Sequence, residues 1–434
     1  MVVIGGSNSA GGGVHNPRLM YFNQVAEWWN NTTGSNLTVV NTSVGGTGSD
    51  FFLFCLENVL PQGLQPDIVL VDTSVNDFGY KYGKAAQPME LLTRRLLLLP
   101  SRPLVMYVNF ILPVFVPFTQ IYTNVDCLNM QDLGFDELAK HYGIPSFSIK
   151  DLACPLSSSK KRKLYMSLSV FSEDKIHAGY KSHEKIASMI INYLKDVLKK
   201  VPGSTTEIES NQNNMPSLVK PLFSDPSISD DQLSNAMCWS HLTNNWKIPL
   251  KQTLDANLTE SRGFRYLTPE ESDRLSINHT AHRTDAYGGW VAKPNKTEYF
   301  LKFKFHIPNN VTSGSVAVIF RIVKTKDVHI GLLLDNKNVT TVYFKKCGGS
   351  LWKITYLYPL ATNIRPGYHS LSIVSDIGGN VVSGIIVGYS SYFPGYESYR
   401  PINLNYWVWS YKQFLQHGCR PEQKLNSNEA PVEI

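Results

Sequence analysis

The sequence changes its hydrophobic period near the middle of the chain, and this change constrains the fold more than any other feature. Up to about residue 200, short apolar runs alternate with segments whose apolar residues recur every three or four positions. The apolar runs begin at Val2, Leu37, Asp67, Pro103 and Ile144. Apolar strands separated by helices are typical of a parallel sheet covered on both faces, so residues 1–200 predict a doubly wound α/β domain.

Beyond residue 235 the apolar residues alternate with polar ones, as in "YFLKFKFHI" from Tyr299, and turn sequences separate the segments. Many short strands without helices between them predict an antiparallel β-sandwich, jelly-roll-like, over residues 235–420. Residues 201–234 are rich in Pro, Ser, Asn, Asp and Glu, which indicates a linker. The polar residues 421–434 predict a disordered tail. A chain of 434 residues is therefore expected to form two domains.

Charge and hydropathy argue against two classes of partner. The net charge of +6 is dispersed, and the dense cluster at residues 160–163 is more typical of a solvated loop than of a nucleic-acid-binding face. The apolar runs are shorter than the ~18 to 20 residues of a membrane-spanning helix. We therefore expect neither a nucleic-acid partner nor stable membrane insertion.

The six cysteines form no Cys-x-x-Cys pair and have no histidine at zinc-ligand spacing, so the sequence predicts no structural metal. Disulfides are the expected use of most of them. Cys127 and Cys154 are a candidate pair, whereas Cys55, in the apolar segment "FFLFCLENVL", is expected to be a buried free thiol. The pairing of the cysteines in the second domain stays open.

Asn-x-Ser/Thr acceptors are frequent, which favours a secreted or lumenal protein. They lie at Asn30, Asn31, Asn36, Asn41, Asn257, Asn278, Asn295, Asn310 and Asn338. A signal segment does not precede the first strand, so we expect a processed or truncated chain; a cytoplasmic location follows if the acceptors are unused.

The candidate chemistry lies at the carboxyl ends of the predicted strands, where reactive groups gather in parallel α/β sheets. Ser7 follows the first strand in the Gly-rich turn "GGSNSAGGG". A serine nucleophile needs a base, which His177 can supply, and Asp174 in "DKIH" can orient the imidazole. We interpret these three residues as a catalytic triad.

An acyl-transfer centre also needs donors for the developing oxyanion. The candidates are the backbone N–H of Ser7, the backbone N–H of Gly46 in "VGGTG" and the side-chain amide of Asn76 in "SVND". Ser9 is an alternative to Ser7, although an N-cap role is expected for it, and Gly45 is an alternative to Gly46.

Other histidines, and a phosphate-binding role for the turn at Ser7, agree less well with the sequence. His183 lies inside the last predicted helix and is expected at the surface, and His15 and His141 have no carboxylate at a suggestive spacing. The turn at Ser7 lacks the Gly-Lys-Ser/Thr ending of a phosphate-binding loop and the spacing of a dinucleotide-binding loop.

With these motifs, the first 200 residues or so resemble the SGNH, or GDSL-like, hydrolases. The matching motifs are Gly5-Gly6-Ser7, Gly46, Ser74-Val75-Asn76-Asp77 and Asp174-Lys175-Ile176-His177. The resemblance implies a flavodoxin-like three-layer fold and ester hydrolysis through an acyl-serine intermediate, without a metal or organic cofactor. Gly6 stands where the family has an aspartate before its serine, and Ser74 stands where the family has a glycine.

The sequence therefore predicts a serine esterase that removes acetyl or other short acyl groups, from a glycan or a small acylated substrate. Two alternatives stay open: an O-acyltransferase acting on polysaccharide, and a non-catalytic surface or adhesion protein with the same fold. Tryptophans of the second domain could stack on sugars or, as the alternating pattern favours, fill the sandwich core. These tryptophans are Trp239, Trp246, Trp290, Trp352, Trp407 and Trp409.

Overall fold

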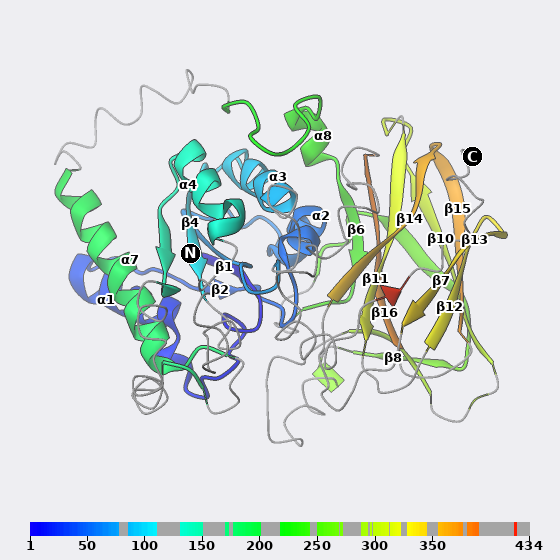
Figure 1. Cartoon of the computed structure of the whole chain (residues 1–434), viewed down its shortest axis with the longest axis horizontal. Helices are drawn as coiled ribbons and strands as arrows, with labels where there is room; N and C mark the ends of the chain where they lie inside the picture. Colours follow the sequence, from blue (N-terminus) through cyan, green and yellow to red (C-terminus); the bar gives the residue numbers. More distant parts are fainter. Residues whose placement is uncertain are drawn as a thin grey trace, which may run out of the picture.

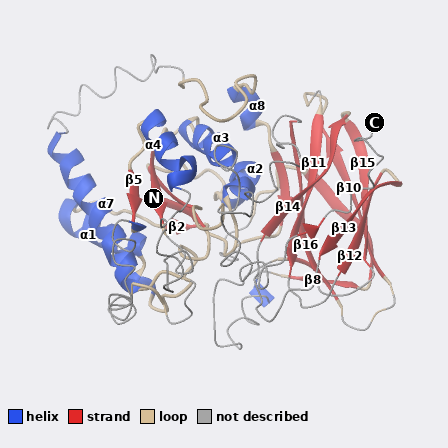
Figure 2. Cartoon of the chain, viewed as in Figure 1, coloured by secondary structure: helices blue, strands red, loops and turns tan. Residues whose placement is uncertain are grey.

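The chain forms an α/β domain and a β-sandwich that lie side by side (Figures 1 and 2), which confirms the predicted fold class. The computed structural model describes residues 1–77, 86–110, 131–150, 170–172, 177–200, 218–243, 250–268, 270–271, 288–293, 296, 298–311, 313–322, 328–344, 355–375, 380–389 and 421–422.

The first domain is built on a five-stranded parallel sheet of order β2-β1-β3-β4-β5. This is the order of flavodoxin-like doubly wound sheets. The strands are β1 (Val2–Gly5), β2 (Val40–Asn41), β3 (Ile68–Asp72), β4 (Leu104–Asn109) and β5 (Ser146–Ser148). Each coincides with one of the predicted apolar runs, and β2 is much shorter than its run.

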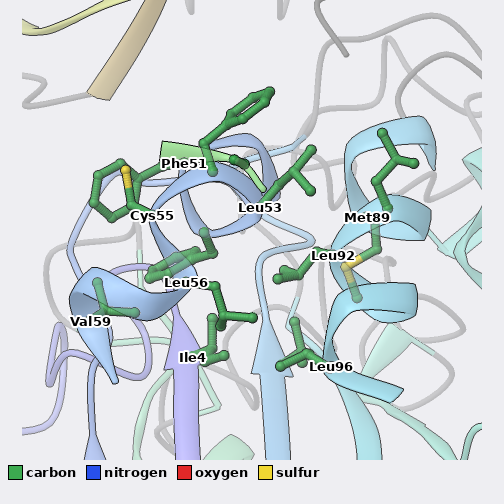
Figure 3. Close-up of a cluster of buried hydrophobic side chains, with 14 of the residues drawn as sticks. Ile4, Phe51, Leu53, Cys55, Leu56, Val59, Met89, Leu92 and Leu96 are labelled. Atoms are coloured by element: carbon green, nitrogen blue, oxygen red, sulfur yellow. The ribbon is translucent and has the colours of Figure 1, made fainter. Parts of the chain in front are cut away.

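Helices cover both faces of this sheet because successive strand residues point to opposite sides. Val3 packs with α1 and α7, whereas Val2 and Ile4 pack with α2, α3 and α4. In Figure 3, Ile4 reaches toward Leu56 of α2 and Leu96 of α3. The helical elements are η1 (Pro17–Leu19), α1 (Tyr21–Thr33), α2 (Ser49–Val59), α3 (Ala86–Leu97), the π-helical turn η4 (Gln131–Phe135), α4 (Asp136–Tyr142) and α7 (Tyr180–Lys200).

The second domain packs two antiparallel sheets face to face. One has the order β17-β13-β12-β15-β10-β7; the other has the order β14-β11-β16-β9-β8, with β6 also paired to β16. The strands are β6 (Met237–Ser240), β7 (Asp255–Arg262), β8 (Phe264–Leu267), β9 (Gly289–Ala292), β10 (Tyr299–Ile307), β11 (Gly314–Ile322), β12 (Val328–Leu334), β13 (Lys337–Phe344), β14 (Thr355–Ile364), β15 (Gly367–Ser375), β16 (Asn380–Tyr389) and β17 (Pro421–Glu422). In β10, alternate residues such as Phe303 and Phe305 are buried, as the period of two predicts.

Two of the tryptophans lie inside the sandwich. The rings of Trp239 and Trp290 are buried and stacked, with centroids 5.1 Å apart, so the core-packing interpretation is confirmed for both. Trp246, Trp352, Trp407 and Trp409 lie outside the described residues.

A single hydrophobic core joins the two domains. It contains Leu56 of α2 together with Ala317 of β11, Leu357 of β14 and Ile386 of β16. In Figure 1, β6 runs between α2 and the rest of the sandwich. The helix α2 therefore packs on its own sheet with one side and on the second domain with the other.

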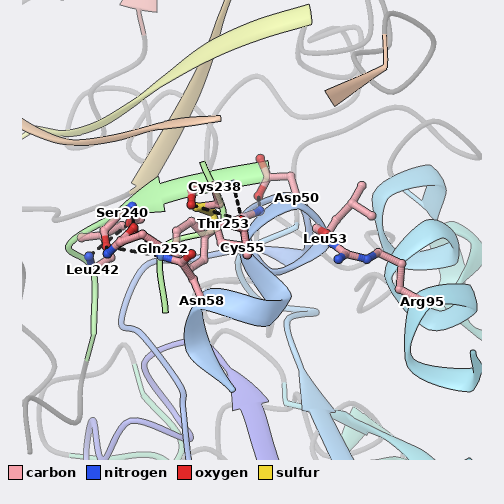
Figure 4. The surroundings of a disulfide bond; sticks show 11 residues. Asp50, Leu53, Cys55, Asn58, Arg95, Cys238, Ser240, Leu242, Gln252 and Thr253 are labelled. Carbon is pink, nitrogen blue, oxygen red and sulfur yellow. Dashed lines mark hydrogen bonds between the residues drawn. A yellow bond between two sulfur atoms is a disulfide. The ribbon is translucent and has the colours of Figure 1, made fainter. Parts of the chain in front are cut away.

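A disulfide between Cys55 of α2 and Cys238 of β6 crosses this interface (Figure 4). The prediction that Cys55 is a free thiol was wrong. The apolar neighbours of Cys55 correctly indicated burial, but its partner is 183 residues away in the sequence, and hydrophobic periodicity does not reveal which distant strand covers a helix. Cys127, Cys154, Cys347 and Cys419 lie outside the described residues.

The described end of the predicted linker, from residue 218, is attached to α3. The buried carboxylate of Glu90 accepts hydrogen bonds from the backbone N–H groups of Leu222, Phe223 and Ser224. Arg94 forms an ion pair with Asp230 at 2.8 Å, at the start of α8 (Asp230–Ser234). At the other end of the chain, β17 pairs with β13 where the disordered tail was predicted to begin.

None of the helices in these described ranges has both the length and the apolar character required to cross a membrane.

Candidate active site

Ser7 lies in a compact turn at the carboxyl end of β1. The N–H of Gly6 donates to the Asp72 carbonyl at 2.8 Å, which ties the start of the turn to β3. The N–H of Gly12 donates to the Ser7 carbonyl at 2.8 Å, which folds the chain back on itself. Ser7 is half-buried in this turn, so the turn holds it at the edge of the sheet where the sequence placed it.

His177 packs against the same turn. A Cβ atom on Gly12 would lie 2.8 Å from Nε2 of His177 and 2.8 Å from the Ser7 carbonyl oxygen, so only a glycine fits there. The N–H of Ala178 also donates to Oδ1 of Asn8 at 2.9 Å. The structure thus brings the His177 segment and the Ser7 turn together, although they lie far apart in the sequence.

Asn76 approaches the turn from the end of β3. A Cβ atom on Gly6 would lie 1.8 Å from Oδ1 of Asn76, so the Asn76 amide occupies the space that a side chain at position 6 would need. The N–H groups of Asn76 and Asp77 both donate to the Thr73 carbonyl at 2.9 Å and close the turn that carries the amide. Gly6, which stands where the SGNH hydrolases have an aspartate, therefore leaves room for Asn76.

The loop of Gly46, between β2 and α2, also approaches Gly6. The Thr47 carbonyl oxygen would be 3.6 Å from a Cβ atom on Gly6. Gly46 has φ +68°, a left-handed conformation that glycine adopts without strain. The predicted nucleophile turn, Gly46 loop and Asn76 turn therefore meet at one edge of the sheet, with Gly45 adjoining as the alternative donor.

Asp174, the third member of the predicted triad, lies outside the described residues. Its role stays a prediction. Ser74, which stands where the family has a glycine, is buried and its hydroxyl donates to the Phe110 carbonyl at 3.3 Å.

A buried chain of hydrogen bonds supports the Ser7 turn. It was not predicted from the sequence. Oγ of Ser9 donates to Oδ2 of Asp72 at 2.6 Å and bonds the hydroxyl of Tyr21 at 2.9 Å. Burial is the main reason that the pKa of Asp72 is raised to about 7. The sequence did contain a signal for Asp72: it is the last residue of β3, so it lies at the same edge of the sheet as the other predicted site residues.

The predicted N-cap role of Ser9 was wrong. Residues 6–13 form turns, and the first helical element begins at Pro17. Ser9 is fully buried, and its hydroxyl is engaged by Asp72 and Tyr21, so the structure gives Ser9 a supporting position.

The prediction that His183 lies at the surface was also wrong. His183 is fully buried, and its ring packs against Phe110 with centroids 4.9 Å apart and against Tyr21 at 5.8 Å. Burial, with a smaller contribution from the nearby His177, lowers the pKa of His183 to about 3. Its spacing from Ile186 and Ile190 places it on the buried face of α7, a signal that was present in the sequence.

Asp77 connects the Asn76 turn to the Gly46 loop. Its Oδ1 accepts a hydrogen bond from the N–H of Ser49 at 2.8 Å, at the start of α2. Burial, followed by repulsion from Asp50, raises the pKa of Asp77 to about 8. Within the described part of the chain, no three His, Cys, Asp or Glu side chains are grouped so that they could hold a metal ion.

These contacts bring a serine, a histidine, a side-chain amide and a glycine loop to one edge of the sheet. Acyl transfer to serine uses these groups as nucleophile, base and oxyanion donors.

Comparisons of the sequence with family models and with curated proteins give no match. Comparison with solved structures finds a two-domain esterase, CEX, described as active on acetylated mannans. That structure is 19% identical, has a TM-score of 0.57, and the match covers 90% of this chain and 91% of CEX. A second structure of CEX, co-crystallised with mannopentaose, gives 18% identity, a TM-score of 0.56 and 90% coverage of both chains. The chain therefore shares its fold, over both domains, with this two-domain esterase.

Proposed function

We propose that the protein is a serine esterase that hydrolyses acyl esters, chiefly acetyl esters, on a glycan. The observation that carries the proposal is the packing of His177 against Gly12 and of Asn76 against Gly6, in the turn that contains Ser7. A base and an amide donor beside a serine, at the carboxyl edge of a parallel sheet, are what acyl transfer to serine requires, and this supports the proposal.

In the proposed reaction, Oγ of Ser7 attacks the ester carbonyl while His177 accepts the hydroxyl proton. Asp174 orients the imidazole and stabilises its charged form. The N–H groups of Ser7 and Gly46 and the side-chain amide of Asn76 stabilise the oxyanion. His177 then returns the proton to the leaving alcohol, and water, activated by the same histidine, hydrolyses the acyl-serine. The sequence of steps requires no metal or organic cofactor.

The substrate class rests on two supports. The residues at the site suit an ester of an alcohol, and the structure of similar fold belongs to an esterase described as active on acetylated mannans. We therefore propose an acetylated polysaccharide as the substrate of this chain.

The test is acetate release from acetylated mannan and from a soluble aryl acetate by the wild-type protein and Ser7→Ala. We expect Ser7→Ala to lose at least about 10³-fold in kcat, because the nucleophile is removed. Ser188→Ala is a matched control, since Ser188 is exposed on α7 and its hydroxyl donates to the Glu184 carbonyl one turn earlier in the same helix. A Ser7→Ala variant that retained the wild-type rate would contradict the proposal.

The same experiment separates the alternatives. Transfer of acetyl from an acyl donor to an oligosaccharide, without free acetate, would indicate the O-acyltransferase. Failure of a fluorophosphonate probe to label Ser7, together with absent hydrolysis, would indicate the non-catalytic protein.

A further inference from the structure

The β-sandwich contacts the Gly46 loop through Thr355, the first residue of β14. The N–H of Thr355 donates to the Gly46 carbonyl at 2.9 Å. Its Oγ1 also bonds Oγ1 of Thr47 at 2.8 Å, and both side chains are buried. A single residue of the second domain therefore holds two consecutive residues of a loop in the first domain.

This loop is short of side chains that could fix it from within. Its sequence is "VGGTGSD", from Val44 to Asp50, and Gly46 has φ +68°. Glycine-rich backbone has many accessible conformations, so a fixed geometry requires contacts from outside the loop. The first domain holds the two ends of the loop, where the N–H of Val44 donates to the Gly5 carbonyl at 2.9 Å and the N–H of Ser49 donates to Oδ1 of Asp77 at 2.8 Å. Thr355 supplies the contact to the middle of the loop, at Gly46 and Thr47.

The β-sandwich that carries Thr355 is itself attached to the first domain. The helix α2, which begins three residues after Gly46, is bonded to β6 by the Cys55–Cys238 disulfide. Lys251, which follows β6 in the second domain, also forms an ion pair with Glu57 of α2 at 3.4 Å. With the shared core around Leu357 of β14, these contacts keep β14 from shifting relative to the loop.

From these contacts we propose that the β-sandwich is a positioning element of the active site, acting through Thr355 on the oxyanion donor Gly46. The inference rests on the proposed esterase function. Thr355 does not touch the reacting atoms in this assignment; it holds the Gly46–Thr47 peptide, which directly follows the donor N–H in the chain and so fixes the conformation of Gly46. The second domain thereby contributes to the chemical step, whether or not it also binds a glycan.

The experiment compares Thr355→Val, Thr355→Ser and Thr47→Val with the wild-type protein in aryl acetate hydrolysis. Valine removes the hydroxyl and keeps the side-chain shape, so the loop loses one of its two bonds to β14. We expect kcat to fall about tenfold with KM within about twofold, since small displacements of catalytic groups reduce the rate of the chemical step. Thr355→Ser keeps the hydroxyl and should restore kcat to within about twofold of wild type.

Three controls make the result specific. Thr259→Val removes a hydroxyl that bonds the Lys302 carbonyl on an exposed strand of the same sandwich, and it should leave kcat unchanged. The double variant Thr47→Val/Thr355→Val should be no slower than the slower single variant, because both changes remove the same bond. Thermal unfolding shows which variants are folded; if Thr355→Val is not, Thr47→Val tests the same bond from the other domain.

Two failures are distinguishable. A wild-type protein without hydrolase activity and without labelling of Ser7 overturns the proposed function and this inference with it. An active wild-type protein whose folded Thr355→Val and Thr47→Val variants keep the wild-type kcat overturns the inference alone.

Discussion

Gly6 is the residue at which this chain departs most clearly from the serine motif of the SGNH hydrolases, and the contacts of Asn76 explain why. The amide oxygen of Asn76 occupies the position that a side chain at residue 6 would take. The turn gains its support elsewhere, from the buried chain formed by Tyr21, Ser9 and Asp72. An acidic residue before the serine is therefore not needed to hold the turn in this protein.

Introducing the family's residue should lower activity. In Gly6→Asp, the new carboxylate displaces the Asn76 amide, and we expect kcat/KM to fall at least about tenfold, since a lost oxyanion donor costs ~10² to 10³ in rate. The melting temperature should change little, because the end of the Asn76 side chain can rotate away. Gly314→Ala, at a sandwich position with ordinary contact distances, is the control. Higher activity in Gly6→Asp would refute this interpretation of Asn76.

Asp72 should make the stability of the protein depend on pH. Its pKa is about 7 in the folded protein, against 3.8 when unperturbed. Between these values the folded state keeps a proton that the unfolded state has lost, so the stability from this group is present below pH ~4 and is lost as pH rises through 7.

Asp72→Asn keeps the shape of the protonated acid and removes this dependence. Relative to wild type, its free energy of unfolding should increase between pH 5 and pH 8 by roughly 3 kcal/mol, as an upper value. Urea denaturation at the two pH values measures the difference. Asp77 and His183 are present in both proteins, so their titration cancels. Parallel pH profiles of the two proteins would show that Asp72 does not titrate in this range.

At the scale of elements, strands of the first domain such as β1 and β3 follow from the sequence because they are short apolar runs buried on both faces, and helices such as α1 and α7 follow because each buries one recognisable face. In α2, by contrast, residues Phe51 to Leu56 are all buried. A helix that is apolar all round is covered on all sides, and this signal indicated a second partner without identifying β6. The disulfide was missed for the same reason.

The residues of the candidate site likewise fall into two groups, those that could be predicted from the sequence and those that could not. Ser7, Gly46, Asn76 and His177 were predictable because reactive residue types follow strands or precede the last helix, at positions that the parallel sheet brings together. The end of β3 pointed to Asp72 as well, but the bonds that Asp72 and Thr355 form were not predictable, because they depend on contacts with residues far away in the sequence. The Thr355 bond to Thr47 spans 308 residues, and no local pattern of residues records such a distance.

At the scale of the whole molecule, the glycosylation acceptors differ in accessibility. Asn31, Asn36, Asn257, Asn310 and Asn338 are exposed, whereas Nδ2 of Asn41 donates to the Ser9 carbonyl at 2.8 Å beside the nucleophile turn. We propose that the protein is secreted or lumenal and carries glycans at exposed acceptors.

We expect Asn41 to be unmodified, because a glycan there would have to break the bond to Ser9. Peptide mapping of the secreted protein after N-glycanase treatment in heavy-oxygen water identifies each occupied asparagine by its mass. The exposed acceptor Asn36 serves as the positive control. Occupancy at Asn41, or absence of modification at every exposed acceptor, would contradict the proposal.

The core shared by α2 and the sandwich also bears on how such a chain can be inherited. Modular proteins exchange domains by recombination at linkers, which leaves each hydrophobic core intact. A crossover near residue 200 in this chain would separate Leu56 from Leu357 and Cys55 from Cys238. Such a crossover would leave the shared core incomplete and would remove the disulfide.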